Sequence, residues 1–226
     1  MKSAKNDTNV AKDAIKDAGR KNRDISPGNL KALTDTKTLR ARARQHVEEG
    51  AVTTGYAADK EAVIGLLNEA LATELVCVLR YKRHYFMAKG IYSESVKGEF
   101  LQHAKEEMAH ADRIAKRITE LGGEPNFSPD GLSSRSHAQY MPGDSLVSMI
   151  KEDLIAERIA IESYREFINY LGNDDPTTQR MIKEILAMEE EHADDMSSLL
   201  DGICCTLTVM ILRRWCLLPN WRWTSA

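Results

Sequence analysis

Residues 105–110, KEEMAH, and residues 188–192, MEEEH, decide the fold of this chain. Each stretch contains a glutamate followed three residues later by a histidine: Glu107 with His110, and Glu189 with His192. Positions three apart lie on one face of an α-helix, so a single turn can offer a metal ion one carboxylate oxygen and one imidazole nitrogen. One such pair alone is more often an ordinary solvated helix face than a metal site. The prediction of a metal centre therefore depends on what accompanies the two pairs.

The two pairs belong to an internal repeat that covers both halves of the chain. Residues 69–74 and residues 152–157 follow the same pattern, Glu-x-Leu-x-x-Glu, and in each half a tyrosine follows seven residues after the last glutamate. The interval from that glutamate to the glutamate of the Glu-x-x-His pair is 33 positions in the first half and 32 in the second. Such a repeat indicates one structural unit used twice. We expect each half to be a helical hairpin that points its carboxylates inward.

The composition is that of a soluble globular protein. Of the 226 residues, 42% are hydrophobic and 29% are charged, which disfavours the disordered and membrane classes. The first 60 residues contain no apolar run of the kind found in a signal peptide, so we expect a cytoplasmic protein without membrane contact. The four cysteines lack metal-ligand spacing. No phosphate-binding loop, zinc-protease motif or nucleophile triad occurs, so those classes of enzyme are set aside.

Residues 1–55 form a polar, basic leader. Up to Arg44 it holds twelve lysines and arginines against five aspartates. Because it has few apolar residues, it cannot bury enough surface to offset the entropy lost on ordering, and we expect it to be mostly disordered. A basic arm of this kind is either a solubilising tail or a contact to the DNA backbone through counterion release. The first use is favoured, and the second stays open.

Helical periodicity predicts four long helices, near residues 60–87, 93–121, 144–171 and 174–200. Ser93 or Ser95 would cap the second helix. The segment between the second and third helices holds three prolines and is too long for a tight turn, which predicts a crossover from one end of a bundle to the other. The predicted fold is all-α: a four-helix bundle of two αα hairpins joined by one long crossover, over residues 56–201.

This arrangement resembles the di-iron carboxylate bundles, in which two helices supply one glutamate each and two supply Glu-x-x-His. On that pattern the metal ligands are Glu74, Glu107, His110, Glu157, Glu189 and His192. Four ionised carboxylates in a bundle core would repel one another, whereas two divalent cations balance their charge. Oxygen-rich ligation with one imidazole per metal suits iron or manganese better than a closed structural zinc site.

From about residue 59 to residue 200 the chain resembles the bacterioferritin and Dps-like branch of the ferritin superfamily. The resemblance is carried by the Glu-x-x-His pairs, the stretch EMAH at 107–110, the glutamates at 74 and 157, and Tyr81. It implies a ferritin-like ferroxidase that oxidises Fe²⁺ with O₂ or H₂O₂ at a di-iron centre. It also implies that the ferric mineral is stored inside a homo-oligomeric cage, whose number of subunits, 12 or 24, the sequence leaves open.

The resemblance further implies a role for each ligand. Glu107 and Glu189 would bridge the two irons, Glu74 and Glu157 would be terminal ligands, and each histidine would complete one iron. Tyr81 matches a tyrosine beside the family's di-iron centre, where it would donate an electron or a hydrogen bond; an amphipathic core tyrosine is the alternative.

Met108 occupies the place of the methionine by which bacterioferritins hold haem b between two subunits. Methionine is also the usual gap-filler of helical cores, and Dps-like relatives bind no haem, so haem is the less favoured alternative at this position.

The C-terminal residues 202–226 do not follow the repeat. An apolar run at 203–212 precedes three tryptophans, and ten apolar residues are too few to span a bilayer, which takes about 20. We expect an unselected extension rather than a fifth helix. Two other functions stay open for the chain as a whole: another di-iron or dimanganese oxidoreductase, which would need a substrate pocket, and a Dps-like DNA-protecting protein that uses the basic arm.

Overall fold

The computed structural model describes residues 33–216, with side chains described up to Ile203. All regular elements among these residues are helical. The leader contributes α2 (Thr36–Arg42) and a 3₁₀ turn (Val47–Glu49). Most of the predicted disordered arm, residues 1–32, lies outside the described residues, so its predicted disorder and its DNA contact stay predictions. The chain divides into two units near Ala41, and the second unit contains the helical bundle.

The first long helix, α3 (Lys60–Met87), has the predicted bounds. The Asp59 side chain caps its start by accepting a hydrogen bond from the Ala62 backbone N–H at 3.1 Å. Its apolar stripe, which includes Val63, Leu67 and Leu71, is fully buried. By length and composition α3 could cross a membrane, but 56% of its apolar window is buried inside the bundle, as expected for a core helix.

The second helix, α4 (Ser93–Glu120), ends one residue before its predicted end. The predicted serine cap is wrong, because Ser93 is the first helical residue and its hydroxyl donates to the Gly90 carbonyl at 2.8 Å instead of capping. The third helix, α6 (Leu146–Leu171), does begin with a serine cap: the Ser145 side chain accepts from the Ser148 N–H at 3.2 Å. Glycines at positive φ follow both helices, at Gly122 and Gly172.

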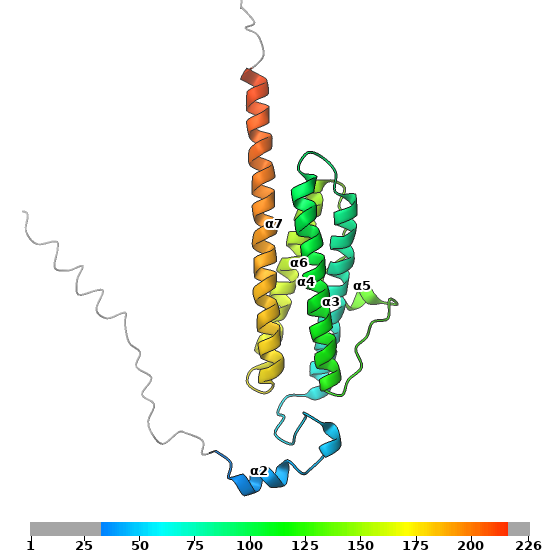
Figure 1. The fold of residues 1–226 in the computed structure, drawn as a ribbon, viewed down its shortest axis with the longest axis vertical. Coiled ribbons are helices and arrows are strands. Elements are labelled where there is room, and N and C mark those ends of the chain that lie inside the picture. The colour runs from blue at the N-terminus through cyan, green and yellow to red at the C-terminus, as the bar shows by residue number, and fades with distance from the viewer. Residues whose placement is uncertain (1–32, 217–226) are drawn as a thin grey trace, which may run out of the picture. The chain divides into compact units, whose positions relative to one another are not determined.

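The fourth helix, α7 (Pro176–Cys216), continues to Cys216, so its predicted end near Leu200 is wrong. Gly202 does not stop the helix, because one glycine inside a helix costs only about 1 kcal/mol and no proline follows it before residue 216. The last part of α7 runs beyond the ends of the other three long helices (Figure 1). Residues 217–226, with two of the three tryptophans, lie outside the described residues.

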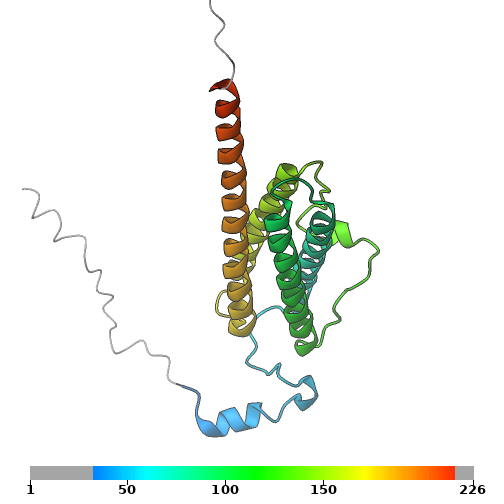
Figure 2. The same cartoon turned by 45° about the horizontal axis from the view of Figure 1, so that its top comes forward.

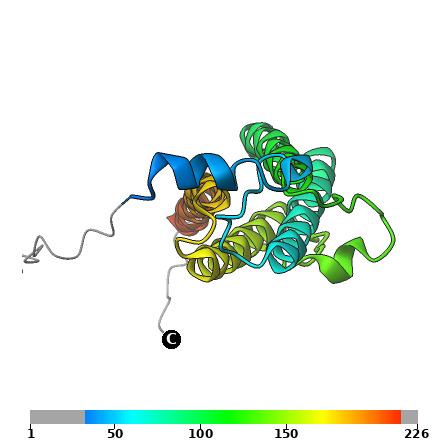
Figure 3. The same ribbon diagram turned by 90° about the horizontal axis from the view of Figure 1, so that it is seen from below.

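The four long helices form two hairpins, α3 with α4 and α6 with α7, joined by the predicted crossover (Figures 1 and 2). The crossover carries one short helix, α5 (Leu132–Arg135), which packs beside α3 and is visible in the view from below (Figure 3). This confirms the all-α bundle of two hairpins with one long crossover. Two apolar clusters fill its core, one around Leu67, Ile114 and Ile182 and the other around Phe100, Ile150 and Met196.

A buried ion network ties the crossover to the bundle. Asp153 on α6 accepts from the Arg80 guanidinium and pairs with His84, both at 2.8 Å, and all three side chains are at most 1% exposed. Arg80 also donates to the Gln139 carbonyl at 3.1 Å, and His84 Nε2 lies 3.1 Å from the Met141 carbonyl. The network fixes the crossover against α3 and α6 beside the polar layer described next.

Candidate metal centre

A polar layer separates the two apolar clusters, and all four long helices contribute to it. On α3, Glu74 lies between the buried residues of one apolar cluster and those of the other. On each of the other three helices, the ligand candidates likewise lie between the two clusters. The structure brings all six predicted ligands together in this layer: Glu74, Glu107, His110, Glu157, Glu189 and His192. Each of them is at most 2% exposed.

The six residues form two groups of four whose ligand atoms lie within 4.8 Å of one another. Glu107 and Glu189 belong to both groups; the full sets are Glu74, Glu107, His110 and Glu189, and Glu107, Glu157, Glu189 and His192. Two metal positions that share two carboxylates are the arrangement expected of a bridged dimetal centre.

The shared carboxylates divide their oxygens between the two histidines. Nδ1 of His110 lies 2.9 Å from Oε1 of Glu189 and 3.4 Å from Oε2 of Glu107. Nδ1 of His192 lies 3.4 Å from Oε1 of Glu107 and 3.6 Å from Oε2 of Glu189. Each bridging candidate therefore offers one oxygen to each metal position.

Most of the proposed ligand atoms have no hydrogen-bond partner among the described residues. Eight buried side-chain atoms lack a hydrogen-bond partner there, and seven of them belong to predicted ligands: both carboxylate oxygens of Glu107 and Glu189, one of Glu157, and Nδ1 of each histidine. Unpaired buried polar atoms are costly and rare in proteins. Their convergence on two points fits two divalent cations, and the donor set of carboxylates with one imidazole per metal fits iron or manganese.

The remaining nitrogen of each histidine meets a partner that the sequence analysis did not identify. Nε2 of His192 lies 3.0 Å from Oε2 of Glu106, and Nε2 of His110 lies 3.4 Å from the sulfur of Met188. A carboxylate on the far nitrogen orients the ring and leaves the other nitrogen free for a metal. Each partner stands directly before a predicted ligand in the sequence, and this adjacency is the signal by which it could have been predicted.

Two tyrosines join the halves of the repeat crosswise. The Tyr81 hydroxyl donates to Oε1 of Glu157, and the Tyr164 hydroxyl donates to Oε1 of Glu74. Both tyrosines are at most 1% exposed. The position of Tyr81 beside a terminal ligand fits its predicted role as a hydrogen-bond partner. Tyr164 has the same place in the repeat, although only Tyr81 was predicted as a site residue.

Residues 64–204 match a family described as a ferritin-like domain, which is more than half of the chain. The chain belongs to the ferritin-like family. It is similar to a bacterioferritin from Desulfovibrio desulfuricans, with 32% identity over 135 residues that cover 59% of this chain and 71% of the relative. It is also 34% identical over 149 residues to a DNA protection during starvation protein from Pyrococcus furiosus, covering 64% of this chain and 80% of the relative.

Solved structures give the same result for this ferritin-like chain. A bacterioferritin-related protein from Bacteroides fragilis, described as a dodecameric thioferritin, matches with a TM-score of 0.65 and 34% identity over 68% of this chain and 92% of that chain. Dps from Thermosynechococcus elongatus matches with a TM-score of 0.60 and 20% identity over 62% of this chain and 91% of that chain, a likeness of fold alone.

In the metal-free state, bound protons offset part of the negative charge of the ferritin-like centre. Burial and the charges of Glu107 and Glu189 raise the pKa values of Glu74 and Glu157 well above the usual range. Burial disfavours an imidazolium, but the surrounding carboxylates outweigh it and raise the pKa of His110 to about 12 and that of His192 to about 11. At neutral pH the two histidines therefore hold protons, and the raised pKa values of Glu74 and Glu157 favour the neutral form of these carboxyls, which offsets the crowding of carboxylates.

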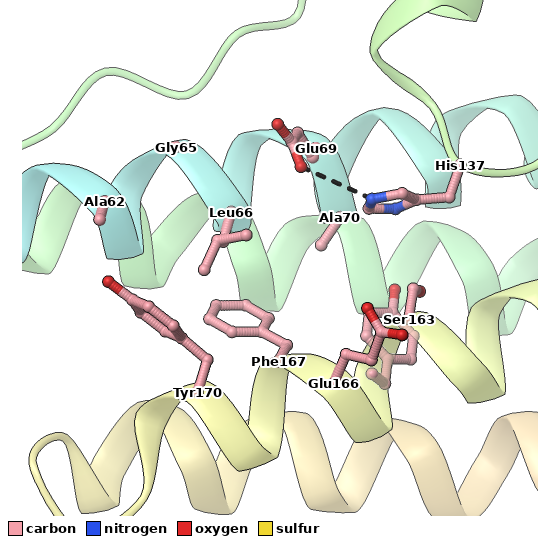
Figure 4. Close-up of a pocket in the computed structure, with 11 residues that line it drawn as sticks. Ala62, Gly65, Leu66, Glu69, Ala70, His137, Ser163, Glu166, Phe167 and Tyr170 are labelled. Carbon is pink, nitrogen blue, oxygen red and sulfur yellow. Dashed lines mark ion pairs between the residues drawn. The ribbon is translucent and has the colours of Figure 1, made fainter.

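A pocket of about 530 Å³ lies between α3 and α6 (Figure 4). Leu66 and Phe167 face it, and the Glu69–His137 ion pair, with 3.5 Å between Oε2 and Nε2, flanks it. Tyr164 lines the pocket, but none of the six predicted ligands does. The pocket therefore ends at the tyrosine that covers Glu74 and does not reach the metal positions.

Met108 lies outside the metal centre. Its side chain is 40% exposed on α4, while its neighbours Glu107 and His110 point into the core. The methionine is therefore not a core gap-filler, and it is available to a ligand or to a second copy of the chain.

Proposed function

We propose that this ferritin-like chain is a ferroxidase that oxidises Fe²⁺ with O₂ or H₂O₂ and stores the ferric product in a homo-oligomeric cage. The observation that carries the proposal is the pair of four-residue groups that share Glu107 and Glu189. Most of the carboxylate oxygens and imidazole nitrogens that converge there have no hydrogen-bond partner among the described residues. The two relatives reported above, a bacterioferritin and a DNA protection during starvation protein, support the iron-storage class.

In this proposal each ligand has the role that the family resemblance implies. Glu107 and Glu189 bridge two Fe²⁺ ions, with one oxygen on each, and His110 and His192 bind one ion each through Nδ1. Glu74 and Glu157 are terminal ligands, oriented by the hydroxyls of the two crosswise tyrosines. Bound Fe²⁺ supplies the electrons that reduce the oxidant. The protein contributes position, charge balance and the exclusion of bulk water from a layer that is almost fully buried.

Proton movement accompanies loading of the centre. Metal binding requires deprotonated ligands, so Fe²⁺ displaces the protons held by the two histidines, and the raised pKa values of the two terminal glutamates favour a proton on these groups that Fe²⁺ would displace as well. Four positive charges on two ions then replace those protons beside four carboxylates.

Anaerobic titration of Fe²⁺ into the metal-free protein, followed by O₂ or H₂O₂, tests the proposal. We expect binding that saturates near two ions per chain and rapid formation of a ferric product, followed by its absorbance. Glu107→Gln should abolish oxidation because an amide cannot bridge two cations, whereas Glu191→Gln, one residue before His192 but exposed, should retain it. Full oxidation by Glu107→Gln would disprove the proposed centre.

The alternative of a different di-iron or dimanganese oxidoreductase gains little support from the geometry. Such an enzyme needs a substrate beside its metals, and none of the six proposed ligands lines the pocket between α3 and α6. Tight binding of two Mn²⁺ ions with no turnover of Fe²⁺ would favour this alternative over the ferroxidase.

The assembly proposed is a homo-oligomeric cage in the cytoplasm without membrane contact. The relative from Bacteroides fragilis is described as dodecameric, which supports 12 subunits over 24 for this chain. Light scattering on the purified protein distinguishes the two, since the chain mass of 25.4 kDa predicts about 300 kDa or about 610 kDa.

Haem b is a further proposal that depends on Met108. Because the methionine is exposed on α4, Met108 from each of two subunits would hold a haem shared between them. Reconstitution with haem should give a methionine-ligated absorbance spectrum that Met108→Leu lacks. An identical spectrum in both proteins would remove haem from the proposal.

DNA protection is the second candidate function, supported by the Pyrococcus furiosus relative and by the basic leader. A gel shift of the intact protein against a variant with leader lysines and arginines replaced by glutamine tests it. We expect the variant to bind DNA more weakly and with a smaller dependence on salt. Equal affinity in both proteins would restrict the function to iron.

A further inference from the structure

Three further side chains converge between α4 and α7, beside the metal centre. Glu99 and His103 lie one turn apart on α4, and Asp195 lies on α7. One ligand atom of each lies within 4.8 Å of the others, and Nε2 of His103 is 3.4 Å from Oδ2 of Asp195. None of the three belongs to the six ligands of the dimetal centre.

Hydrogen bonding fixes which nitrogen of His103 carries the proton. The Tyr81 hydroxyl has a single proton and donates it to Glu157, so towards His103 it can only accept. Nδ1 of His103, 3.2 Å from that hydroxyl, is therefore the protonated nitrogen. In the neutral ring, Nε2 then presents a lone pair, and it presents it to the carboxylates of Glu99 and Asp195.

A lone pair that faces two carboxylates is repulsive unless a cation lies between them. His103 is 1% exposed, and its Nε2 lies 3.4 Å from Oδ2 of Asp195, so either a proton or a metal ion must lie between these two atoms. A proton on Nε2 would supply one positive charge against two negative ones. A divalent cation would balance both carboxylates and accept the lone pair.

We propose that Glu99, His103 and Asp195 form a third divalent-cation site. Its donors, one imidazole nitrogen and two carboxylates, suit Fe²⁺, Mn²⁺ or Co²⁺. The neighbouring group of His103, Glu106 and His192 is not a separate site, because His192 also belongs to the dimetal centre. The Asp195 side chain is 46% exposed, so a cation can reach the site from solvent.

The third site is directly coupled to the dimetal centre. The His103 ring stacks on the His192 ring, with 4.1 Å between centroids and 21° between planes. Through Tyr81, His103 is also hydrogen-bonded to the terminal ligand Glu157. If the proposed ferroxidase function holds, the site would hold Fe²⁺ between solvent and the centre; the binding of a cation does not depend on that function.

Anaerobic titration with Co²⁺ alone, followed by its visible absorbance and by metal analysis, tests the proposal. We expect three tightly bound Co²⁺ ions per chain in the unaltered protein and two in Glu99→Gln/Asp195→Asn. The matched control, Glu94→Gln/Asp194→Asn, removes the same charge from exposed positions on the same two helices and should retain three. Two ions in all three proteins would overturn the proposal and indicate a proton only on His103.

A second variant separates this proposal from the proposed function. Glu107→Gln/Glu189→Gln removes both bridging carboxylates and should leave one Co²⁺ per chain, bound at the third site. If the unaltered protein binds a single Co²⁺ that Glu99→Gln/Asp195→Asn loses, the third site stands and the dimetal centre fails. If Glu107→Gln/Glu189→Gln does not fold, the loss of one equivalent in Glu99→Gln/Asp195→Asn still decides the question.

Discussion

Tyr81 of α3 donates a hydrogen bond to Glu157 of α6, so a side chain from the first half of the repeat holds a proposed terminal ligand of the second half. Tyr164 of α6 holds Glu74 of α3 in the same way. The two contacts are related by the sequence repeat, and each crosses between hairpins. Neither half can therefore complete its own ligand environment alone.

Tyr81→Phe should destabilise the metal-free protein by about 1–3 kcal/mol, because Glu157 loses its donor and Nδ1 of His103 loses its acceptor. Metal affinity should fall by about 10- to 100-fold, the usual effect of losing an outer-shell partner. Urea unfolding and Fe²⁺ titration measure the two effects. Tyr164→Phe is the matched variant, and it should cost less than Tyr81→Phe because no histidine is bonded to its hydroxyl within the described residues. Equal behaviour of both variants and the unaltered protein would show that the crosswise contacts contribute nothing.

Glu74→Gln and Glu107→Gln should differ strongly in their effect on the stability of the metal-free protein. Burial and neighbouring charges raise the pKa of Glu74, which favours its neutral form, and glutamine is a neutral substitute of the same shape. Glu107 is buried as well, but its contacts with Glu74 and with the imidazoliums of His110 and His192 hold its pKa below the usual range.

We expect Glu74→Gln to change the free energy of unfolding by less than about 1 kcal/mol and Glu107→Gln to lower it by about 3–5 kcal/mol, since the second leaves buried imidazoliums without their partner. Chemical denaturation in the presence of a chelator measures both. Strong destabilisation by Glu74→Gln would mean that the glutamate is ionised in the metal-free core. Both variants should lose Fe²⁺ oxidation.

The metal-free protein should lose stability as pH rises above neutrality. The pKa of His110 is about 12 and that of His192 about 11, against 6.5 for the free side chain, so from pH 6.5 upwards the folded chain keeps protons that the unfolded chain has released. Stability falls with pH wherever the folded state binds more protons, so this contribution is complete below pH 6.5 and is lost towards pH 11. The melting temperature at pH 6 and pH 9 with a chelator measures it. His110→Gln/His192→Gln should show a smaller slope, and an equal slope would assign the dependence to other groups.

Loading the centre should release at least two protons per chain at neutral pH, one from each histidine. Anaerobic Co²⁺ addition to a weakly buffered solution containing a pH indicator measures them.

The repeat made the fold predictable from sequence, together with the convergence of the six proposed ligands. Its spacing placed Glu74 and Glu157 in equivalent positions, and two Glu-x-x-His turns required four helices around one centre. Contacts between helices could not be predicted in the same way, because periodicity reports which face of a helix is buried and not which residue it meets. Glu106 and His103 looked like ordinary helix residues, and only the packing of α4 against α7 places them beside His192.

The end of the fourth helix was mispredicted for a different reason. Gly202 has the local signature of a helix stop, and the repeat has no counterpart to the residues after it. A helix end is set by the balance between a small glycine cost and the helix-forming tendency of the following residues, and here that tendency prevails.

Asp153→Asn should destabilise the protein by about 3–5 kcal/mol, because it leaves the buried guanidinium of Arg80 without its carboxylate. Arg80 and His84 then hold the crossover less firmly, so residues near Gln139 should become sensitive to limited proteolysis. Asp144→Asn is the control, since Asp144 is exposed at the start of α6 and should change stability by less than about 0.5 kcal/mol. A proteolysis pattern identical to that of the unaltered protein would show that the network does not fix the crossover.

Ile203 tests where the functional part of α7 ends. It is 6% exposed and belongs to the apolar cluster that contains Phe100 and Met196, so Ile203→Ala should cost about 2–5 kcal/mol by urea unfolding, while Ser198→Ala, exposed on the same helix, should cost little. Ending the chain after Gly202 removes Ile203 together with everything that follows it. If the truncation costs no more than Ile203→Ala and the protein still assembles, residues 204–226 add nothing to the fold, as an unselected extension predicts. A larger cost, or loss of the assembly, would show that the rest of the chain makes stabilising contacts within or between subunits.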